Sequence, residues 1–254
     1  MIKIGIIGGS GLDDPDILKN PSETKIYTPY GPPSSVLTSG SIEGVEVIIL
    51  ARHGKQHSIY PSKVNFRANI WALKECGCTH VLASTAVGSL REEIEPGHLV
   101  FPDQFIDFTK KRETTFFDED VVMHTPMAEP FCPNLRGLLT ESARELGLAH
   151  HDARTLVCIE GPRFSTRAES HLFRSWNADV INMSTVPEVN LAREKQMHYA
   201  AVAMSTDYDC WRAGEESVTW EMIMEIMRNN ADRVIRLFLD VIPRIRHYHD
   251  VCVG

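Results

Sequence analysis

The six cysteines of this 254-residue sequence include no CxxC pair, so the usual spacings of zinc ribbons and redox sites are missing. Scattered cysteines of this kind favour free thiols used as small apolar residues in a reducing compartment. No stretch approaches the roughly 20 apolar residues of a membrane span. The N-terminal MIKIGIIGGSG is too short and too glycine-rich for a signal peptide. We therefore expect a cytoplasmic protein.

Basic residues are in the minority, with 26 Lys and Arg against 34 Asp and Glu and a formal net charge of −8. A broad nucleic-acid or anionic-membrane surface would need a basic patch, so we expect neither partner. A small anion could still be held by a few local donors. Hydrophobic residues make up 43% of the chain, enough for a large core without disulfides or metals.

Short segments rich in Val and Ile alternate with helical patterns along the chain. This alternation predicts one α/β domain over residues 1–254, with strands covered on both faces. The expected strands are 3–8, 45–50, 80–85, 155–160, 179–184 and 199–206. The expected helices are 62–75, 134–146, 187–197 and 218–243. Dense Pro, Gly and Ser near 29–40 and 126–133 predict loops.

Ligands of such sheets bind beyond the carboxyl ends of the strands, so the residues that follow each strand matter most. The first strand is followed by GGSG, in which Ser10 adds a hydroxyl to a backbone that can approach an anion. A dinucleotide fingerprint fails because Asp14 stands where GxGxxG needs its last glycine. GxxxxGK[ST] is absent as well. A phosphate site and a plain tight turn both remain open here.

Arg52 and His53 follow the second expected strand and form a donor pair suited to a phosphate. His57 lies four residues after His53, which raises the possibility of a zinc site. HExxH would require a glutamate where Gly54 stands, and no Cys or carboxylate cluster supplies further ligands, so we expect no metal. A histidine satisfied within a loop is the ordinary alternative.

The other strand ends add hydroxyls and an aromatic ring. Thr85 and the Ala86 N–H could donate to the same anion, and Ser184 could do so or cap the following helix. Phe164 could stack on a flat base, although a core position is the commoner fate of Phe. Because no acidic cluster for Mg²⁺ accompanies these donors, they predict a site for free inorganic phosphate.

Asp207 and Asp209 stand where the last expected strand ends. A polar turn is the usual place for Asp. A free Asp side chain has a pKa of about 3.9, so it is ionised at neutral pH. Partial burial and a second carboxylate nearby would raise the pKa of one of them and make it an acid.

Several long motifs together resemble the purine nucleoside phosphorylase family, and within it the methylthioadenosine phosphorylases. The resemblance runs from about residue 3 to about residue 243, and only the tail 246–254, expected to be peripheral, falls outside it. It implies a single domain with a twisted mixed β-sheet flanked by helices. The motifs are GIIGGSGLDDP, ARHGKQHSIYPSKVNFRANIWALKE, GSLREEIEPG, DQFID, PMAEPFCP, IEGPRFSTRAES, DVINMSTVPEV and AMSTDYDCW.

The resemblance implies phosphorolysis of methylthioadenosine, a homotrimer or homohexamer, and no cofactor besides phosphate as co-substrate. The implied phosphate ligands are Ser10, Arg52, His53, Thr85, Ala86 and Ser184. The implied neighbours of base and ribose are His57, Phe164, Ser165, Asn182, Met183, Asp207 and Asp209. The implied methylthio pocket is Trp220, Ile223 and Met224. The implied contribution from a neighbouring subunit is His124.

Cleavage of a bond to adenine requires a proton for the leaving purine. We assign Asp207 as the donor to N7 and Asp209 as the acceptor from the 6-amino group or as support for Asp207. A phosphorylase for 6-oxopurine nucleosides or methylthioinosine is an alternative, although it would be expected to carry an amide at the base. A non-catalytic nucleoside-binding module and a nicotinamide-dependent oxidoreductase are alternatives of other classes.

Overall fold

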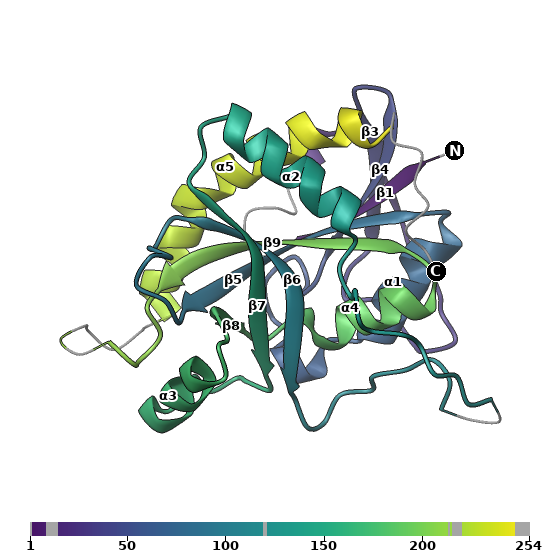
Figure 1. Ribbon diagram of the computed structural model, residues 1–254. Coiled ribbons are helices and arrows are strands. Elements are labelled where there is room, and N and C mark those ends of the chain that lie inside the picture. The colour runs from purple at the N-terminus through teal and green to yellow at the C-terminus, as the bar shows by residue number, and fades with distance from the viewer. Residues whose placement is uncertain (1, 9–14, 119–120, 213, 215–219, 247–254) are drawn as a thin grey trace.

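A computed structural model of the chain describes residues 2–8, 15–118, 121–212, 214 and 220–246, with the side chains of 220–225 and 227–229 left out (Figure 1). The strands are β1 (Lys3–Gly8), β2 (Lys19–Thr24), β3 (Leu37–Ile42), β4 (Val45–Ala51), β5 (His80–Ser89), β6 (Leu99–Phe108), β7 (His150–Ile159), β8 (Val180–Asn182) and β9 (His198–Asp207). The helices are α1 (Phe66–Glu75), α2 (Pro133–Glu145), α3 (Arg167–Ser175), α4 (Thr185–Glu194) and α5 (Trp220–Ile245), with 3₁₀ turns η1 (Pro15–Ile17) and η2 (Pro61–Lys63).

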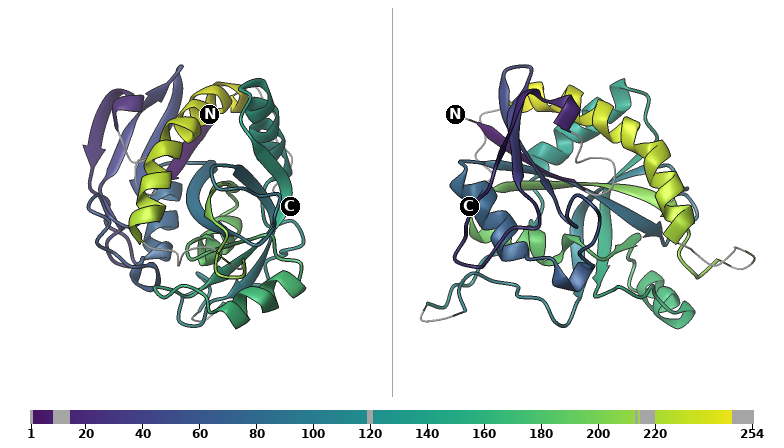
Figure 2. Two further views of the ribbon diagram at one scale, coloured as in Figure 1. Left: turned by 90° about the vertical axis from the view of Figure 1, so that its left-hand side faces the viewer. Right: turned by 180° about the vertical axis from the view of Figure 1, so that it is seen from behind.

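Among the described residues the strands form one mixed sheet in the order β2-β3-β4-β1-β5-β8-β7-β6-β9. Strand β9 pairs with β6 and also with β5, so β5, β8, β7, β6 and β9 close into a ring. The sheet continues on one side of this ring as an open part formed by β1, β4, β3 and β2, which Figure 2 shows beside the ring. The predicted fold class, an α/β protein with a twisted mixed sheet flanked by helices, is confirmed.

Two helical layers cover the sheet, and each buries one apolar stripe. Helices α2 and α5 pack on one face, where Leu139 and Phe238 join the same buried cluster as Ile4. Helices α1 and α4 pack on the other face, where Leu73 and Val189 belong to a second cluster (Figure 1). The strands therefore need apolar side chains on both faces, which explains their continuous rather than alternating hydrophobicity.

The helix predicted over 62–75 is divided at Asn65. This side chain accepts a hydrogen bond from the Ala68 N–H and so caps α1, which starts at Phe66. Residues 61–63 form the separate turn η2. The helix itself was predicted correctly, but its predicted start at residue 62 was wrong. The apolar periodicity continues across Asn65, and the capping bond of Asn65 sets the first residue of the helix.

The sequence prediction missed β2, β3, β6 and α3. Strand β2, KNPSET, is exposed along its whole length and forms an edge of the sheet, so its sequence lacks the apolar signal of a buried strand. Strand β3 occupies part of the segment 29–40 that was predicted as loop, and pairing with β4 decides its conformation. Helix α3 is short but has a complete capping box formed by Thr166 and Glu169.

Strand β5 continues four residues beyond its predicted end at residue 85. One edge of β5 pairs with β9, and the other edge pairs with β1 as far as Ala83 and with β8 from Gly88. Within the described residues this second edge has no strand partner between these two points. The gap opens the sheet beside residues 84–87, and this opening positions the site described below.

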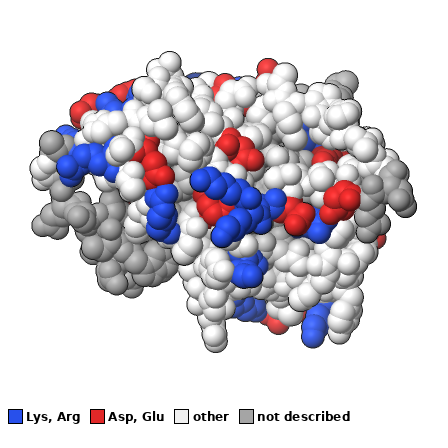
Figure 3. All heavy atoms as spheres, turned by 90° about the horizontal axis from the view of Figure 1, so that it is seen from below, with Lys and Arg blue, Asp and Glu red and all other residues white. Residues whose placement is uncertain are grey.

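On the face seen from below Figure 1, basic and acidic side chains are interleaved rather than gathered by sign (Figure 3). Across the part of the chain that the structure describes, no helix combines the length and the apolar character required to cross a bilayer.

Candidate active site

A cavity of about 410 Å³ lies where the carboxyl-terminal parts of β4, β5, β7, β8 and β9 converge. Its volume is in the range of small-molecule sites. The residues predicted from the strand ends meet here although they are far apart in the sequence. Those that line it are Arg52, His53, His57, Thr85, Ala86, Phe164, Ser165, Asn182, Met183, Ser184, Asp207 and Asp209.

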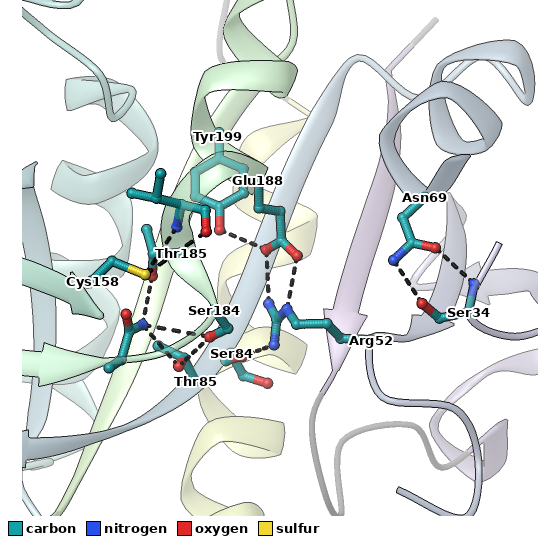
Figure 4. Close-up of polar contacts among 12 residues, drawn as sticks. Ser34, Arg52, Asn69, Ser84, Thr85, Cys158, Ser184, Thr185, Glu188 and Tyr199 are labelled. Atoms are coloured by element: carbon teal, nitrogen blue, oxygen red, sulfur yellow. Dashed lines mark hydrogen bonds and ion pairs between the residues drawn. The ribbon is translucent and has the colours of Figure 1, made fainter. Parts of the chain in front are cut away.

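One end of the cavity is a cluster of hydroxyl groups. The Oγ atoms of Thr85 and Ser184 are 2.8 Å apart, and the Asn182 amide donates to the Thr85 hydroxyl at 3.1 Å and to Thr185 Oγ1 at 2.7 Å (Figure 4). Ser184 occupies the N-cap position of α4 but makes no side-chain capping bond. Its hydroxyl is therefore held beside the cavity by Thr85, where it can donate a hydrogen bond to an anion.

Arg52 joins the same end of the cavity but has a partner that the sequence analysis did not foresee. Its Nε and Nη2 donate to the two carboxylate oxygens of Glu188 at 2.8 and 2.7 Å, and its Nη1 donates to the Ser84 carbonyl at 2.8 Å. A guanidinium carries five N–H groups, so two are left for a ligand, one on each terminal nitrogen. Glu188 largely balances the charge of Arg52.

His53, the predicted companion of Arg52 in a donor pair, lines the same cavity and is held by a main-chain carbonyl. Burial, together with the positive charge of Arg52, lowers its pKa to about 4, so the ring is neutral at pH 7. Its Nδ1 lies 2.7 Å from the Ile59 carbonyl oxygen, which assigns the ring proton to Nδ1. Nε2 is then a hydrogen-bond acceptor. The predicted role of His53 in phosphate binding stays a prediction, and the structure adds that its half-buried ring is held by the Ile59 carbonyl.

The opposite end of the cavity holds the two carboxylates. Asp207 accepts hydrogen bonds at 2.7 Å from the Thr206 hydroxyl and at 2.7 Å from the Asp209 N–H. Asp209 is buried and accepts from the Ser165 hydroxyl at 2.6 Å. Both side chains line the cavity even though β9 ends at Asp207 and Asp209 has a left-handed φ of 50°. A turn after the strand, rather than a continued strand, brings them together.

Burial raises the pKa of Asp207 to about 6. The nearby Asp209 carboxylate also raises it, while the hydrogen bonds from Thr206 and the Asp209 N–H act in the opposite direction. Desolvation dominates because the side chain is enclosed by the sheet. A fraction of about a tenth of the Asp207 carboxyl groups is therefore protonated at pH 7, so this side chain can act as a general acid.

Apolar side chains form the walls between the two ends. Ile181, Met183 and Met204 line the cavity together with Phe164, whose side chain is 42% exposed. Phe164 is thus not a core residue, and its ring is available to a flat ligand. Gly161 has a φ of +67°, and a Cβ there would come within 2.5 Å of Met183 Sδ, so the glycine makes room for this wall.

Comparison with known proteins places this chain in a family. A family model described as the phosphorylase superfamily matches residues 3–243. The chain belongs to the phosphorylase superfamily. An S-methyl-5'-thioadenosine phosphorylase from Danio rerio is 56% identical over 249 residues, covering 96% of this chain and 89% of the relative. One from Thermofilum pendens is 57% identical over 244 residues, covering 96% and 92%.

Solved structures agree with these relatives. Methylthioadenosine phosphorylase from Schistosoma mansoni in complex with adenine has a TM-score of 0.94 and 42% identity, covering 98% of this chain and 93% of that one. A variant of the adenosine/methylthioadenosine phosphorylase from that organism, in complex with methylthioadenosine, has a TM-score of 0.93 and 40% identity, with the same coverage of both chains. The family resemblance inferred from the motifs is confirmed.

Some predicted site residues of this superfamily member lie outside the described part of the chain. Ser10 is one, and the side chains of Trp220, Ile223 and Met224 at the start of α5 are the others. Their predicted roles remain predictions. His124 is exposed and is not among the residues that line the cavity of this chain.

The structure adds site residues that the sequence analysis missed. Glu188 and Tyr199 support Arg52, and the Arg112 guanidinium donates to the main-chain carbonyls of Glu160, Met183 and Val186. Glu188 did leave a signal, because it stands among the apolar residues Val186, Pro187 and Val189 of α4, and a buried carboxylate needs a partner. Arg112 left none, since it lies in a polar loop.

No cluster of three or more His, Cys, Asp or Glu side chains suited to a metal ion occurs in the described ranges. His53 and His57, the pair that raised the zinc possibility, have ring centroids 4.5 Å apart. Among the described residues these two rings form no such cluster with a Cys, Asp or Glu side chain.

Proposed function

We propose that this enzyme transfers the 5-methylthioribosyl group of S-methyl-5′-thioadenosine to inorganic phosphate, releasing adenine and 5-methylthioribose 1-phosphate. One observation carries the proposal: a single cavity joins a hydroxyl and guanidinium cluster at one end to a half-buried, partly protonated Asp207 at the other. Relatives named for this activity, more than 50% identical over 96% of the chain, support it.

The two ends of the cavity divide the reaction between them. A phosphate oxygen attacks C1′ of the ribose as the C1′–N9 bond breaks, and the electron pair of that bond passes to the purine. Asp207 donates its proton to N7 of the leaving base, which typically accelerates such steps by about 10²–10⁴-fold. The charge of the bound phosphate stabilises the positive character that develops on the ribose, and its fixed position lowers the entropic barrier.

Asp209 selects the base. Its carboxylate accepts a hydrogen bond from Ser165, and its remaining acceptor capacity suits the N–H groups of a 6-amino substituent. A 6-oxo group needs a hydrogen-bond donor at this point, whereas carboxylate oxygens accept hydrogen bonds. The pair of carboxylates therefore favours adenine over a 6-oxopurine or methylthioinosine.

His53 acts as an acceptor toward the substrates. Because Nδ1–H is directed to the Ile59 carbonyl, Nε2 can receive a hydrogen bond from a P–OH group or from a ribose hydroxyl. The donors to the phosphate are then Thr85, Ser184, Arg52 and the neighbouring main chain. The phosphate is thus bound mostly by neutral groups, together with Arg52, whose charge is balanced by Glu188.

An assay of adenine release with and without phosphate tests the proposed function. We expect release from methylthioadenosine that depends on phosphate, with slower release from adenosine and little from inosine. Release that is independent of phosphate, or binding without release, would contradict the proposal and favour a hydrolase or a nucleoside-binding module. Faster cleavage of inosine would instead identify a 6-oxopurine phosphorylase.

The pKa of Asp207 predicts the pH dependence of the reaction. The acid must be protonated, and its pKa is about 6, so kcat/KM should fall by up to tenfold per pH unit above about pH 6. His53, with a pKa of about 4, should add no change between pH 6 and 8. Rates measured at constant monohydrogen phosphate check this, and a profile that rises from pH 6 to 8 would argue against Asp207 as the acid.

Gly88 allows the two carboxylates to lie close to β5. A Cβ at this position would be 3.1 Å from Asp207 Oδ1, 3.1 Å from Ile181 and 3.3 Å from Asp209 Cβ. Gly88→Ala should push the acid out of place by tenths of an ångström and lower kcat by about tenfold, with phosphate affinity unchanged. Gly137→Ala on α2, where a Cβ meets nothing within 4 Å, is the matched control and should keep full activity. Equal rates for the two variants would contradict the prediction.

We further propose that the active enzyme is a homotrimer or homohexamer in which His124 of one subunit completes the site of another. The exposed side chains of Val121, Val122 and Met123 beside it support a buried role in an assembly. No cofactor besides phosphate is proposed, and the chain is proposed to act as one catalytic domain. Sedimentation velocity at several concentrations, compared with the activity of His124→Ala, tests the assembly.

A further inference from the structure

Glu188 is a carboxylate with no solvent exposure in the layer beneath the anion end of the cavity. It accepts three hydrogen bonds: two from Arg52, at 2.8 and 2.7 Å, and one from the Tyr199 hydroxyl at 2.7 Å. Figure 4 shows the carboxylate of Glu188 between the tyrosine ring and the guanidinium. The three side chains come from α4, the segment after β4, and β9, so only the folded chain brings them together.

Stability alone is a poor reason for this arrangement. The side chains of Arg52 and Glu188 are 2% and 0% exposed, and Tyr199 is 1% exposed. Taking two charges out of water costs free energy that their attraction barely returns, and apolar residues of similar size often stabilise a protein as well or better. Val186 and Val189, the neighbours of Glu188 on α4, are buried apolar side chains, so an apolar residue at position 188 would have similar surroundings.

The hydrogen bonds of Arg52 point to another reason. Glu188 takes Nε–H and one N–H of Nη2, and the Ser84 carbonyl takes one N–H of Nη1. The guanidinium is thereby fixed in rotation, and one N–H on each terminal nitrogen remains for an oxyanion. Arg52 lines the cavity beside Thr85 and Ser184, whose hydroxyls form the rest of the anion end.

We propose that Glu188, supported by Tyr199, is a positioning residue for phosphate. It holds the Arg52 guanidinium in the orientation in which its two remaining N–H groups can each donate to an oxygen of one phosphate. It also balances the charge of Arg52, so the phosphate is bound more by well-placed hydrogen bonds than by net charge attraction. The inference rests on the proposed function, because it takes the anion in the cavity to be the phosphate co-substrate. Its signature is a loss of phosphate affinity with adenine affinity preserved.

The test measures two dissociation constants by titration calorimetry, one for inorganic phosphate without nucleoside and one for adenine without phosphate. Glu188→Gln places an amide N–H₂ against the donors of Arg52 or Tyr199. We expect phosphate to bind about tenfold more weakly, and adenine within about twofold of the wild type. The phosphate KM should rise in parallel while the nucleoside KM does not.

Because Glu188→Gln leaves a buried cation without its counter-charge, it could fail to fold. Tyr199→Phe keeps the ion pair and removes only one hydroxyl, so it is the second variant. Its phosphate affinity should fall by about threefold. Asp179→Asn is the matched control: Asp179 is also buried and accepts from Arg91 at 2.8 Å, but it does not line the cavity, so phosphate affinity should not change.

Thermal unfolding shows whether each variant is folded. The proposal is overturned if the folded variants bind phosphate as tightly as the wild type. Equal losses of phosphate and adenine affinity would also overturn it, since that result describes a structural role only. Should Glu188→Gln not fold, unchanged phosphate affinity of Tyr199→Phe decides against it. A wild type that binds phosphate in a Glu188-dependent manner but releases no adenine would support the positioning role and refute the proposed function.

Discussion

Replacement of Asp207 by Asn is expected to lower kcat for adenine release by about 10²–10⁴-fold. The amide has nearly the same shape but cannot give N7 a proton. The hydroxyl and guanidinium end of the cavity is formed by other residues, so the phosphate dissociation constant should stay within about twofold of the wild-type value. Single-turnover rates with methylthioadenosine, together with phosphate titrations, measure the two effects separately.

The control for this substitution is Asp240→Asn. Asp240 belongs to a half-buried ion pair with Arg244 on α5 and does not line the cavity. It should leave both kcat and phosphate affinity unchanged. An Asp207→Asn enzyme that releases adenine at the wild-type rate would remove Asp207 from the role of acid. The same variant should also lose the decline of kcat/KM above about pH 6, because no carboxyl remains at this position to titrate.

Replacement of Arg52 by Met is expected to damage stability and phosphate binding together. Glu188 would be left in a fully buried site with only Tyr199 as a partner, and breaking a buried ion pair in this way typically costs about 3–5 kcal/mol of unfolding free energy. The phosphate would lose charge-assisted contacts, each worth about 1.5–3 kcal/mol, so its affinity should fall by at least tenfold. Urea unfolding and calorimetric titration with phosphate give the two quantities.

A double variant separates the two consequences. Arg52→Met combined with Glu188→Gln no longer buries an unpaired charge, so much of the lost stability should return while phosphate affinity stays low. Arg91→Met, which breaks the half-buried pair with Asp179, is the control and should leave phosphate affinity unchanged. A double variant that recovers phosphate affinity as well as stability would show that Arg52 does not contact the anion.

The local sequence was informative wherever apolar side chains or turn signals decide structure. Strands β1, β4 and β9 were predicted nearly to the residue because each is a run of buried apolar side chains. The polar strand β2 and the extension of β5 were not, since their conformation depends on hydrogen bonds to strands that are distant in the sequence. Residues that follow the strands were identifiable as a site because parallel strands bring their carboxyl ends to one edge.

By itself the sequence indicated many of the polar residues that line the cavity, because Arg52, Ser184, Asp207 and Asp209 lie at or just after the ends of strands that are recognisable by their apolar residues. Only the tertiary structure decided how those residues behave. The pKa of Asp207, the ring proton of His53 and the partner of Arg52 each depend on burial and on groups supplied by other elements. Electrostatic free energies depend on distances in space and on the exclusion of water, and neither is encoded in the neighbouring residues of the sequence.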